Sequence, residues 1–185
     1  MALTHIDPQA ALVVIDMQKG IVALPTVHPA SEITRRIAEL AQAFRSQSLP
    51  VILVNVAGRA PGRTDTRLNF TPPADWAELV PELRPQAGDY TVTKLQPGAF
   101  CGTALEQILR RCGVTQIFLA GIATSIGVES TARAAFDLGY HVVTIKDAMT
   151  DLDAAAHQHS IEKIFPRLSE VTECKDVLAQ LSQRA

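Results

Sequence analysis

The chain has 185 residues and a formal net charge of −2, with 47% hydrophobic and only 19% charged residues. This length suits one domain, residues 1–185, with a substantial core. Lysine and arginine are scattered, so we expect no nucleic-acid partner, and no apolar run approaches the ~20 residues of a membrane span, so we expect no membrane contact.

The three cysteines form no CxxC pair, which argues against a disulfide framework or a zinc knuckle. The first residues lack the basic and apolar segments of a secretory signal. These features predict a cytoplasmic protein, and the low share of charged residues hints that some surface is buried against another subunit.

The first half of the chain alternates between strand and helix patterns. Residues 11–15 form a continuous apolar run rich in β-branched residues, which is typical of a parallel strand buried on both faces. It ends at Asp16. A helical spacing of apolar residues follows from about Ser31, and a second apolar run, residues 51–54, ends at Asn55.

A long stretch rich in proline and glycine, Ala57–Gly88, comes next. A connection of this length inside an α/β domain is usually functional or carries a short helix, here expected within Asp75–Leu83. Arg59 and Arg63 on this stretch could bind a substrate carboxylate through two hydrogen bonds each, or could be solvated loop charges.

The second half continues the alternation. A short strand ends at Lys94, and Thr124 or Ser125 is placed to cap a helix that follows a buried strand. The predicted strands are 90–93, 116–120, 141–145 and 171–173, and the predicted helices are 103–111, 127–138, 154–164 and 176–181. The whole pattern predicts a three-layer α/β/α sandwich with a mostly parallel sheet of five or six strands.

Polar residues end these predicted parallel strands and should face one crevice, because ligands bind at the carboxyl ends of such strands. They are Asp16, Asn55, Lys94, the turn Gly121–Gly127 and Asp147. Plain solvation explains one such residue alone. Asp16 and Lys94 together indicate either a functional pair or a structural ion pair.

Three sequence blocks carry a resemblance to a known family. They are VVIDMQ at 13–18, Lys94 followed by PGAF at 97–100, and GIATS at 121–125 followed by VESTAR at 128–133. In order and spacing they resemble the signature blocks of the isochorismatase-like hydrolases. The resemblance covers nearly the whole chain and implies the same α/β architecture.

Most members of that family are cysteine hydrolases that cleave C–N bonds with an Asp–Lys–Cys triad. The resemblance implies that Asp16 is the acid/base, that Lys94 is its cationic partner, and that a cis peptide bond between Ile122 and Ala123 helps to form an oxyanion hole. Members commonly form dimers or larger homo-oligomers, so we expect a homodimer or a higher homo-oligomer.

The triad cysteine is missing, because the matching position is Gly127. Without a thiol no acyl-enzyme can form there. The isochorismatases proper also have glycine at this position and hydrolyse a vinyl ether, so ether or enol-ether hydrolysis is favoured. In that scheme Asp16 must be protonated, with a raised pKa.

Two alternatives remain open. One is a non-catalytic binding protein that kept the pocket. The other is a C–N amidohydrolase that uses Cys101, although a small residue buried at a helix start is the more ordinary interpretation of that cysteine.

Further residues are expected around a small-molecule substrate. Gln18 and Asn55 would orient substrate or water, and Arg59, Phe100 and Thr124 would contact the substrate. No cofactor and no metal are expected, because residues 55–59 lack the histidine of the Asp-x-His metal site in nicotinamidase-like members. His157 and His159 are expected to be solvated at the surface.

Overall fold

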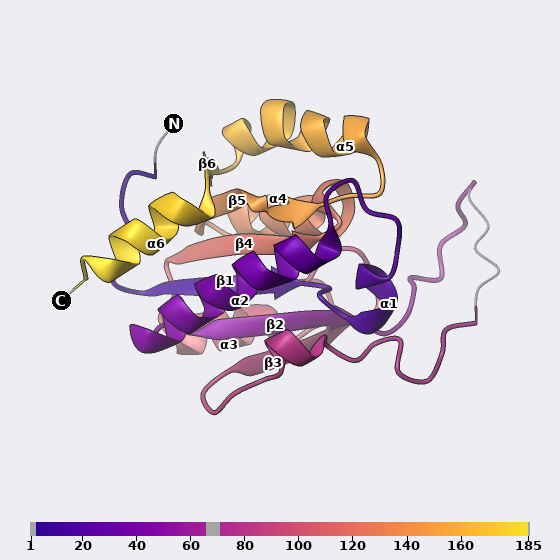
Figure 1. The fold of residues 1–185 in the computed structure, drawn as a ribbon, viewed down its shortest axis with the longest axis horizontal. Helices are drawn as coiled ribbons and strands as arrows, with labels where there is room; N and C mark the ends of the chain where they lie inside the picture. The colour runs from indigo at the N-terminus through magenta and orange to yellow at the C-terminus, as the bar shows by residue number, and fades with distance from the viewer. Residues whose placement is uncertain (1–2, 66–70, 185) are drawn as a thin grey trace.

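The computed structural model describes residues 3–65 and 71–184. Its centre is a six-stranded, wholly parallel sheet with the strand order β3-β2-β1-β4-β5-β6, which confirms the predicted fold class (Figure 1). The strands are β1 (Ala10–Ile15), β2 (Val51–Val56), β3 (Tyr90–Lys94), β4 (Gln116–Ile122), β5 (His141–Thr150) and β6 (Glu170–Thr172).

The apolar run of β1 is continuous because both faces of the sheet are covered. Alternate side chains of a strand point to opposite faces, so Leu12 and Val14 enter one core while Val13 and Ile15 enter the other. All six residues of this strand are buried. The continuous apolar pattern therefore indicates a central strand of the sheet.

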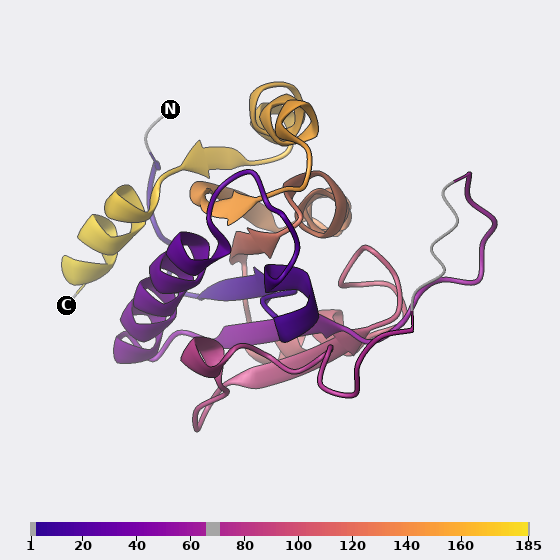
Figure 2. The same ribbon diagram turned by 45° about the vertical axis from the view of Figure 1, so that its right-hand side comes forward.

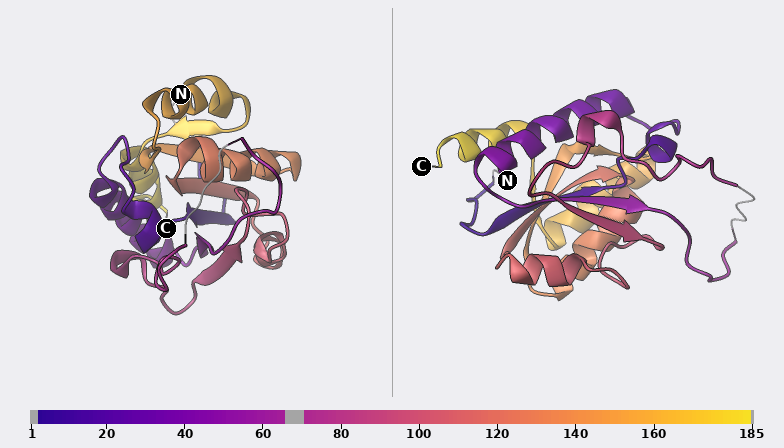
Figure 3. Two further views of the ribbon diagram at one scale, coloured as in Figure 1. Left: turned by 90° about the vertical axis from the view of Figure 1, so that its right-hand side faces the viewer. Right: turned by 90° about the horizontal axis from the view of Figure 1, so that it is seen from below.

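Helices form the two outer layers. The view from below shows α2 and α6 on one side of the sheet and α3 on the other (Figure 3). Apolar residues of α4 share the core of α3. No helix within the described ranges is long and apolar enough to cross a membrane. The helices are α1 (Lys19–Val22), α2 (Ala30–Ser46), α3 (Leu105–Arg111), α4 (Glu129–Asp137), α5 (Ala154–His159) and α6 (Cys174–Ser182), with shorter turns η1 (Pro81–Leu83), η2 (Thr124–Val128), η3 (Ser160–Ile164) and η4 (Phe165–Arg167).

The strand order reverses between β1 and β4, which places the expected crevice at the carboxyl ends of these two strands. Gly121 in β4 makes this close pairing possible. Its φ is +124°, and a Cβ atom there would lie 2.0 Å from the carbonyl oxygen of Ile15. Any side chain at this position would push the two strand ends apart.

The stretch Ala57–Gly88 is mostly irregular, and residues 66–70 of it lie outside the described ranges. Residues 57–65 extend away from the sheet (Figure 2). The short helix expected within Asp75–Leu83 is present only at Pro81–Leu83, as a single 3-10 turn. Proline clashes with the carbonyl four residues before it, and that carbonyl, of Ala77, accepts a hydrogen bond from Asn55 instead.

Strand β5 does not end where the sequence predicted. Its pairing with β4 jumps from Thr144 opposite Leu119 to Met149 opposite Gly121, so the intervening residues bulge. The expectation that Asp147 faces the crevice is therefore wrong. Its carboxylate accepts the Cys174 backbone N–H at 2.8 Å, and it lies 3.8 Å from the Arg36 guanidinium.

Candidate active site

Asp16 and Lys94 meet at the carboxyl ends of β1 and β3, as the sequence predicted. Lys94 Nζ donates to Asp16 Oδ2 at 2.6 Å and to the Gln96 carbonyl oxygen at 3.2 Å. Asp16 is 5% exposed and Lys94 2%. Asp16 adopts φ +53°, and its N–H donates to the Val54 carbonyl, so the chain turns sharply as it leaves the sheet.

The Asp16 carboxyl group is only half satisfied. Its Oδ2 binds Lys94, whereas Oδ1 is buried without a hydrogen-bond partner. Burial raises the pKa of Asp16 to about 6, although the charge of Lys94 and its hydrogen bond both act to lower it. A buried oxygen without a partner on a group that titrates near neutrality is typical of an active-site acid or base.

Gly127 faces this carboxyl group. A Cβ atom built on Gly127 would lie 3.3 Å from Asp16 Oδ2, so a side chain there would point at the Asp16–Lys94 pair. The same Cβ would lie 2.8 Å from Ile15 Cγ2. In this protein, the Ile15 methyl group fills part of the space that a side chain at position 127 would need.

The turn between β4 and α4 begins with a cis peptide bond between Ile122 and Ala123, as the family resemblance implied. The Ala123 carbonyl then accepts hydrogen bonds from the N–H groups of Ile126 and Val128, which form the π-helical turn η2. This turn leads the chain past Gly127 and into α4.

The expected cap of this turn is wrong, because neither Thr124 nor Ser125 caps it with its side chain. Instead the Asp151 carboxylate accepts the Ser125 N–H at 2.7 Å. Asp151 is buried and stands directly after β5. Asp151 therefore occupies the position after the strand that the sequence predicted for Asp147, because the bulge in β5 moves the end of this strand to Thr150.

Thr124 points into the protein. Its hydroxyl group is fully buried and contacts the Thr150 carbonyl oxygen at 3.1 Å and His157 Nδ1 at 2.8 Å. The surface position expected for His157 is therefore wrong, because its side of α5 faces the turn, whereas His159 is exposed as expected. These contacts occupy the hydroxyl group that was expected to bind substrate.

Gln18 and Asn55 lie at the strand ends, but their amide groups hold other parts of the protein. Gln18 Nε2 donates to the Val56 and Trp76 carbonyl oxygens, and Oε1 accepts the Val56 N–H. Asn55 Nδ2 donates to Ala77, and Oδ1 accepts from the Thr93 hydroxyl group. Both side chains position the segment around Trp76 over the sheet, and substrate contact would require them to exchange partners.

The remaining predicted site residues lie on loops outside the strands. Phe100 is buried, with its ring centroid 6.0 Å from that of Tyr140. Arg59 is exposed and donates to the Thr64 hydroxyl group. The expectation that Cys101 is buried is wrong, because it lies exposed in a turn before α3.

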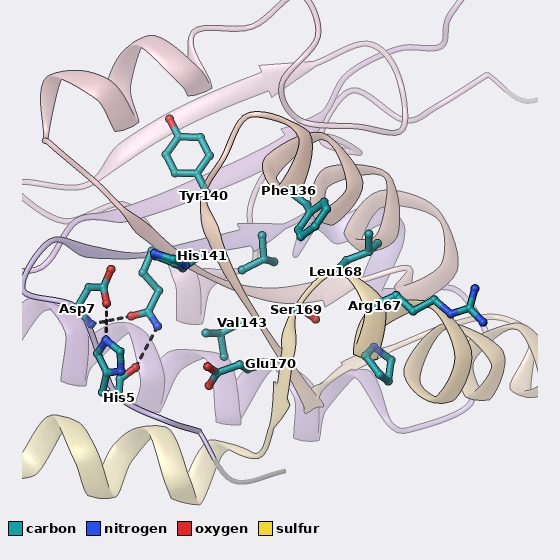
Figure 4. A pocket seen from close by; sticks show the side chains of 13 residues that line it. His5, Asp7, Phe136, Tyr140, His141, Val143, Arg167, Leu168, Ser169 and Glu170 are labelled. Carbon is teal, nitrogen blue, oxygen red and sulfur yellow. Dashed lines mark hydrogen bonds and ion pairs between the residues drawn. The ribbon is translucent and has the colours of Figure 1, made fainter.

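Two surface hollows lie elsewhere. One, of about 290 Å³, is bordered by side chains that include His5, Asp7, His141 and Glu170 (Figure 4). The other, of about 500 Å³, lies along α2 beside Val80 and Glu82. Neither is lined by the Asp16–Lys94 pair. Across residues 3–65 and 71–184, no three histidine, cysteine or acidic side chains are grouped to hold a metal ion.

The chain is similar to known proteins over nearly its whole length. Residues 10–176 match the isochorismatase domain. An uncharacterized isochorismatase family protein, YwoC, of Bacillus subtilis (strain 168) is 43% identical over 98% of this chain and 99% of its own. An isochorismatase family protein from Burkholderia thailandensis has a similar structure, with a TM-score of 0.87 and 41% identity over 97% of this chain and 98% of its own.

Two other similar proteins are named for C–N bond hydrolysis. The ureidoacrylate amidohydrolase RutB of Yersinia enterocolitica is 40% identical over 60% of this chain and 52% of its own length. N-carbamoylsarcosine amidase from Thermoplasma acidophilum has a TM-score of 0.72 and 27% identity, over 90% of this chain and 96% of its own. With its fold, its Asp16–Lys94 pair and these likenesses, the chain belongs to the isochorismatase family, within the cysteine hydrolase superfamily, and is a hydrolase.

Proposed function

We propose that the protein hydrolyses an ether or enol-ether bond of a small molecule, with Asp16 as the acid and water as the nucleophile. The observation that carries this proposal is the unpartnered Oδ1 of Asp16, on a carboxyl group whose burial raises its pKa to about 6. Gly127 supplies no nucleophile beside it.

The contacts of Asp16 indicate which oxygen carries the proton. Lys94 donates to Oδ2, so a proton on the carboxyl group resides on Oδ1, which faces no other partner. From there it is transferred to the methylene carbon of an enol ether, which leaves an oxocarbenium ion. Water adds to that ion, its proton returns to Asp16, and the hemiketal breaks down to a ketone and an alcohol.

Lys94 opposes the protonated state of Asp16, since its charge lowers the pKa of that carboxyl group. A substrate carboxylate bound beside Lys94 would offset this charge and favour the acid form. We therefore propose an anionic enol ether as the substrate class, with Ala123 and the η2 turn that follows it lining the opposite side. Arg59 and Phe100 are further candidate contacts on neighbouring loops.

The test uses isochorismate, an anionic enol ether of pyruvate, and measures pyruvate release. The wild-type protein is expected to release pyruvate, and Asp16→Asn is expected to lose this activity. Cys101→Ser is the control and should be unaffected. Wild-type turnover that survives Asp16→Asn would overturn the proposal, and so would a complete absence of turnover on this and related anionic enol ethers.

The names of similar proteins favour a second candidate, an amidohydrolase acting on C–N bonds. Cys101 would have to be its nucleophile, although that thiol is exposed whereas Asp16 and Lys94 are buried. Release of ammonia from ureidoacrylate or N-carbamoylsarcosine that is lost in Cys101→Ser would support this candidate. Ligand binding without turnover of either class would indicate a binding protein.

We further propose that the chain works as one domain, in the cytoplasm, as a homodimer or larger homo-oligomer. The free thiols of Cys101, Cys112 and Cys174 support a reducing compartment. The low share of charged residues, 19%, supports a surface partly covered by a second copy.

A further inference from the structure

A second buried polar layer lies behind the η2 turn and has no part in the chemistry described above. His157 Nδ1 lies 2.8 Å from Thr124 Oγ1, and Thr124 Oγ1 lies 3.1 Å from the carbonyl oxygen of Thr150. The ring of His28 covers that of His157, with 4.9 Å between centroids. Thr124 and Thr150 are fully buried, and His157 is 5% exposed.

The hydrogen-bonding capacity of Thr124 fixes the direction of both contacts. A threonine hydroxyl group has one proton to donate, whereas a carbonyl oxygen can only accept. When both contacts are hydrogen bonds, the Thr124 proton points to the Thr150 carbonyl oxygen and the hydroxyl oxygen accepts from His157. His157 thus carries a proton on Nδ1, in the neutral form as well as in the cationic one.

We propose that His157 is a positioning residue for the η2 turn. Its Nδ1–H donates to the Thr124 hydroxyl group, directs that group onto the end of β5, and so holds the turn that runs from Ala123 past Gly127. An effect of the turn on catalysis rests on the proposed function. The direction of the hydrogen bond and its effect on the position of the turn do not depend on that function.

Two further observations support this role. The Asp151 carboxylate holds the next residue, Ser125, so the turn is tied to β5 and its extension at two successive positions. Burial, followed by the nearby His28, lowers the pKa of His157, while Asp151 acts to raise it. The imidazole is therefore mainly neutral at pH 7, and a neutral donor can be buried here at far lower cost than a cation.

The first experiment measures the imidazole ¹⁵N chemical shifts of His157 by NMR, in the wild-type protein at pH 7.5. We expect a protonated Nδ1 and an unprotonated Nε2, with the Nδ1 proton slow to exchange. The reverse tautomer, with the proton on Nε2, would overturn the proposal. His159 serves as the internal reference, because it is exposed and should show the shifts of a solvated histidine.

The second experiment measures amide hydrogen exchange in peptides that cover residues 121–128. His157→Leu removes the donor and is expected to speed exchange there about tenfold, the equivalent of 1.4 kcal/mol. His157→Asn offers a side-chain N–H and should restore most of the protection. His159→Leu is the matched control on the same helix and should leave these residues unchanged.

Unchanged exchange in His157→Leu, or equal acceleration in the leucine and asparagine variants, would overturn the proposal. If His157→Leu fails to fold, Thr124→Val provides the second variant, since it preserves volume and removes only the hydroxyl group. This substitution should speed amide exchange in residues 121–128. It should also remove the preference of His157 for the tautomer that is protonated on Nδ1. Neither readout requires turnover, so failure of the proposed enol-ether chemistry would be seen separately.

Discussion

Two ion pairs in this protein each join an aspartate to a basic side chain, and they differ in how many of the carboxylate's hydrogen-bonding positions are filled. Arg45 donates to both oxygens of Asp89, at 3.1 and 2.7 Å, and the Gln86 N–H donates to Asp89 as well. Asp16 receives a single donor, Lys94, and its Oδ1 has no partner. The Asp89 side chain is 2% exposed and that of Asp16 7%.

The difference separates structure from function. The Asp89 carboxylate has a hydrogen-bond donor on each oxygen and joins α2 to the segment before β3, so neither oxygen is free to bind a ligand. A buried carboxylate with one free oxygen has a desolvation cost that its partner does not fully offset, so its pKa rises. That free oxygen, rather than the ion pair itself, marks the candidate active site.

The largest expected effect comes from replacing the half-satisfied carboxyl group. Asp16→Asn removes the acid, while asparagine accepts the positive φ at this position. We expect kcat/KM for an enol-ether substrate to fall by about 10²–10⁴-fold. The melting temperature should also fall, because the substitution leaves the buried Lys94 ammonium group without a counter-charge. Steady-state kinetics and thermal unfolding measure the two effects, and a fall of less than threefold would contradict an acid role.

Breaking the saturated pair should lower stability without a loss of activity. Arg45→Met leaves Asp89 without its cation, so the free energy of unfolding should fall by about 2–3 kcal/mol, with kcat unchanged. Urea titration measures the loss. Arg35→Met on the same helix breaks only the exposed pair with Glu39, and that control should lose no more than about 0.5 kcal/mol.

The third prediction concerns pH. Folding raises the pKa of Asp16 from 3.8 to about 6, so the folded state binds this proton more tightly than the unfolded chain. The resulting stabilisation is complete below pH 3.8 and disappears as the pH rises through 6. Between pH 4 and pH 7 the wild-type protein should therefore lose about 2 kcal/mol more of its unfolding free energy than Asp16→Asn does.

Urea titrations of both proteins at the two pH values give this difference directly. Groups that titrate in both proteins cancel in the comparison. Parallel stability profiles for the wild-type protein and Asp16→Asn would show that the folded-state pKa of Asp16 is not raised.

The smallest effect tests the space beside the Asp16 carboxyl group, at position 127. Alanine is a better helix former than glycine, yet Gly127→Ala should lower stability by about 1 kcal/mol because its Cβ meets Ile15 Cγ2. A double-mutant cycle with Ile15→Ala should recover that loss as a favourable coupling energy. Simple additivity of the two substitutions would show that the two positions do not compete for space.

The sequence predicts the framework of this site well, for identifiable reasons. A continuous apolar run reveals where the first strand ends, and a short segment rich in β-branched residues precedes Lys94, so the sequence places Asp16 and Lys94 at strand ends although 78 positions separate them. The six-stranded sheet follows from the same runs. Only the family resemblance singles out position 127, and in the structure a side chain at this position would point toward Asp16.

The failures share a different cause. A bulge in β5 decides that Asp151, and not Asp147, lies at the end of that strand, and no local sequence pattern predicts this bulge. His157 and Gln18 are buried because of what packs against them from distant segments. Strand ends are encoded locally, whereas the partner of a polar side chain is decided by tertiary packing.

Asp16 follows β1, Lys94 ends β3, and the turn beside them joins β4 to α4. This spacing along the chain has a consequence for protein synthesis. When Asp16 leaves the ribosome it is an ordinary solvated carboxylate. It becomes a buried group with a raised pKa only after the neighbouring strands, which include distant parts of the chain such as β4, have been synthesised and have joined the sheet, and folds rich in such distant contacts form slowly. The raised pKa of Asp16 is therefore a property of the assembled sheet and is absent from the nascent chain.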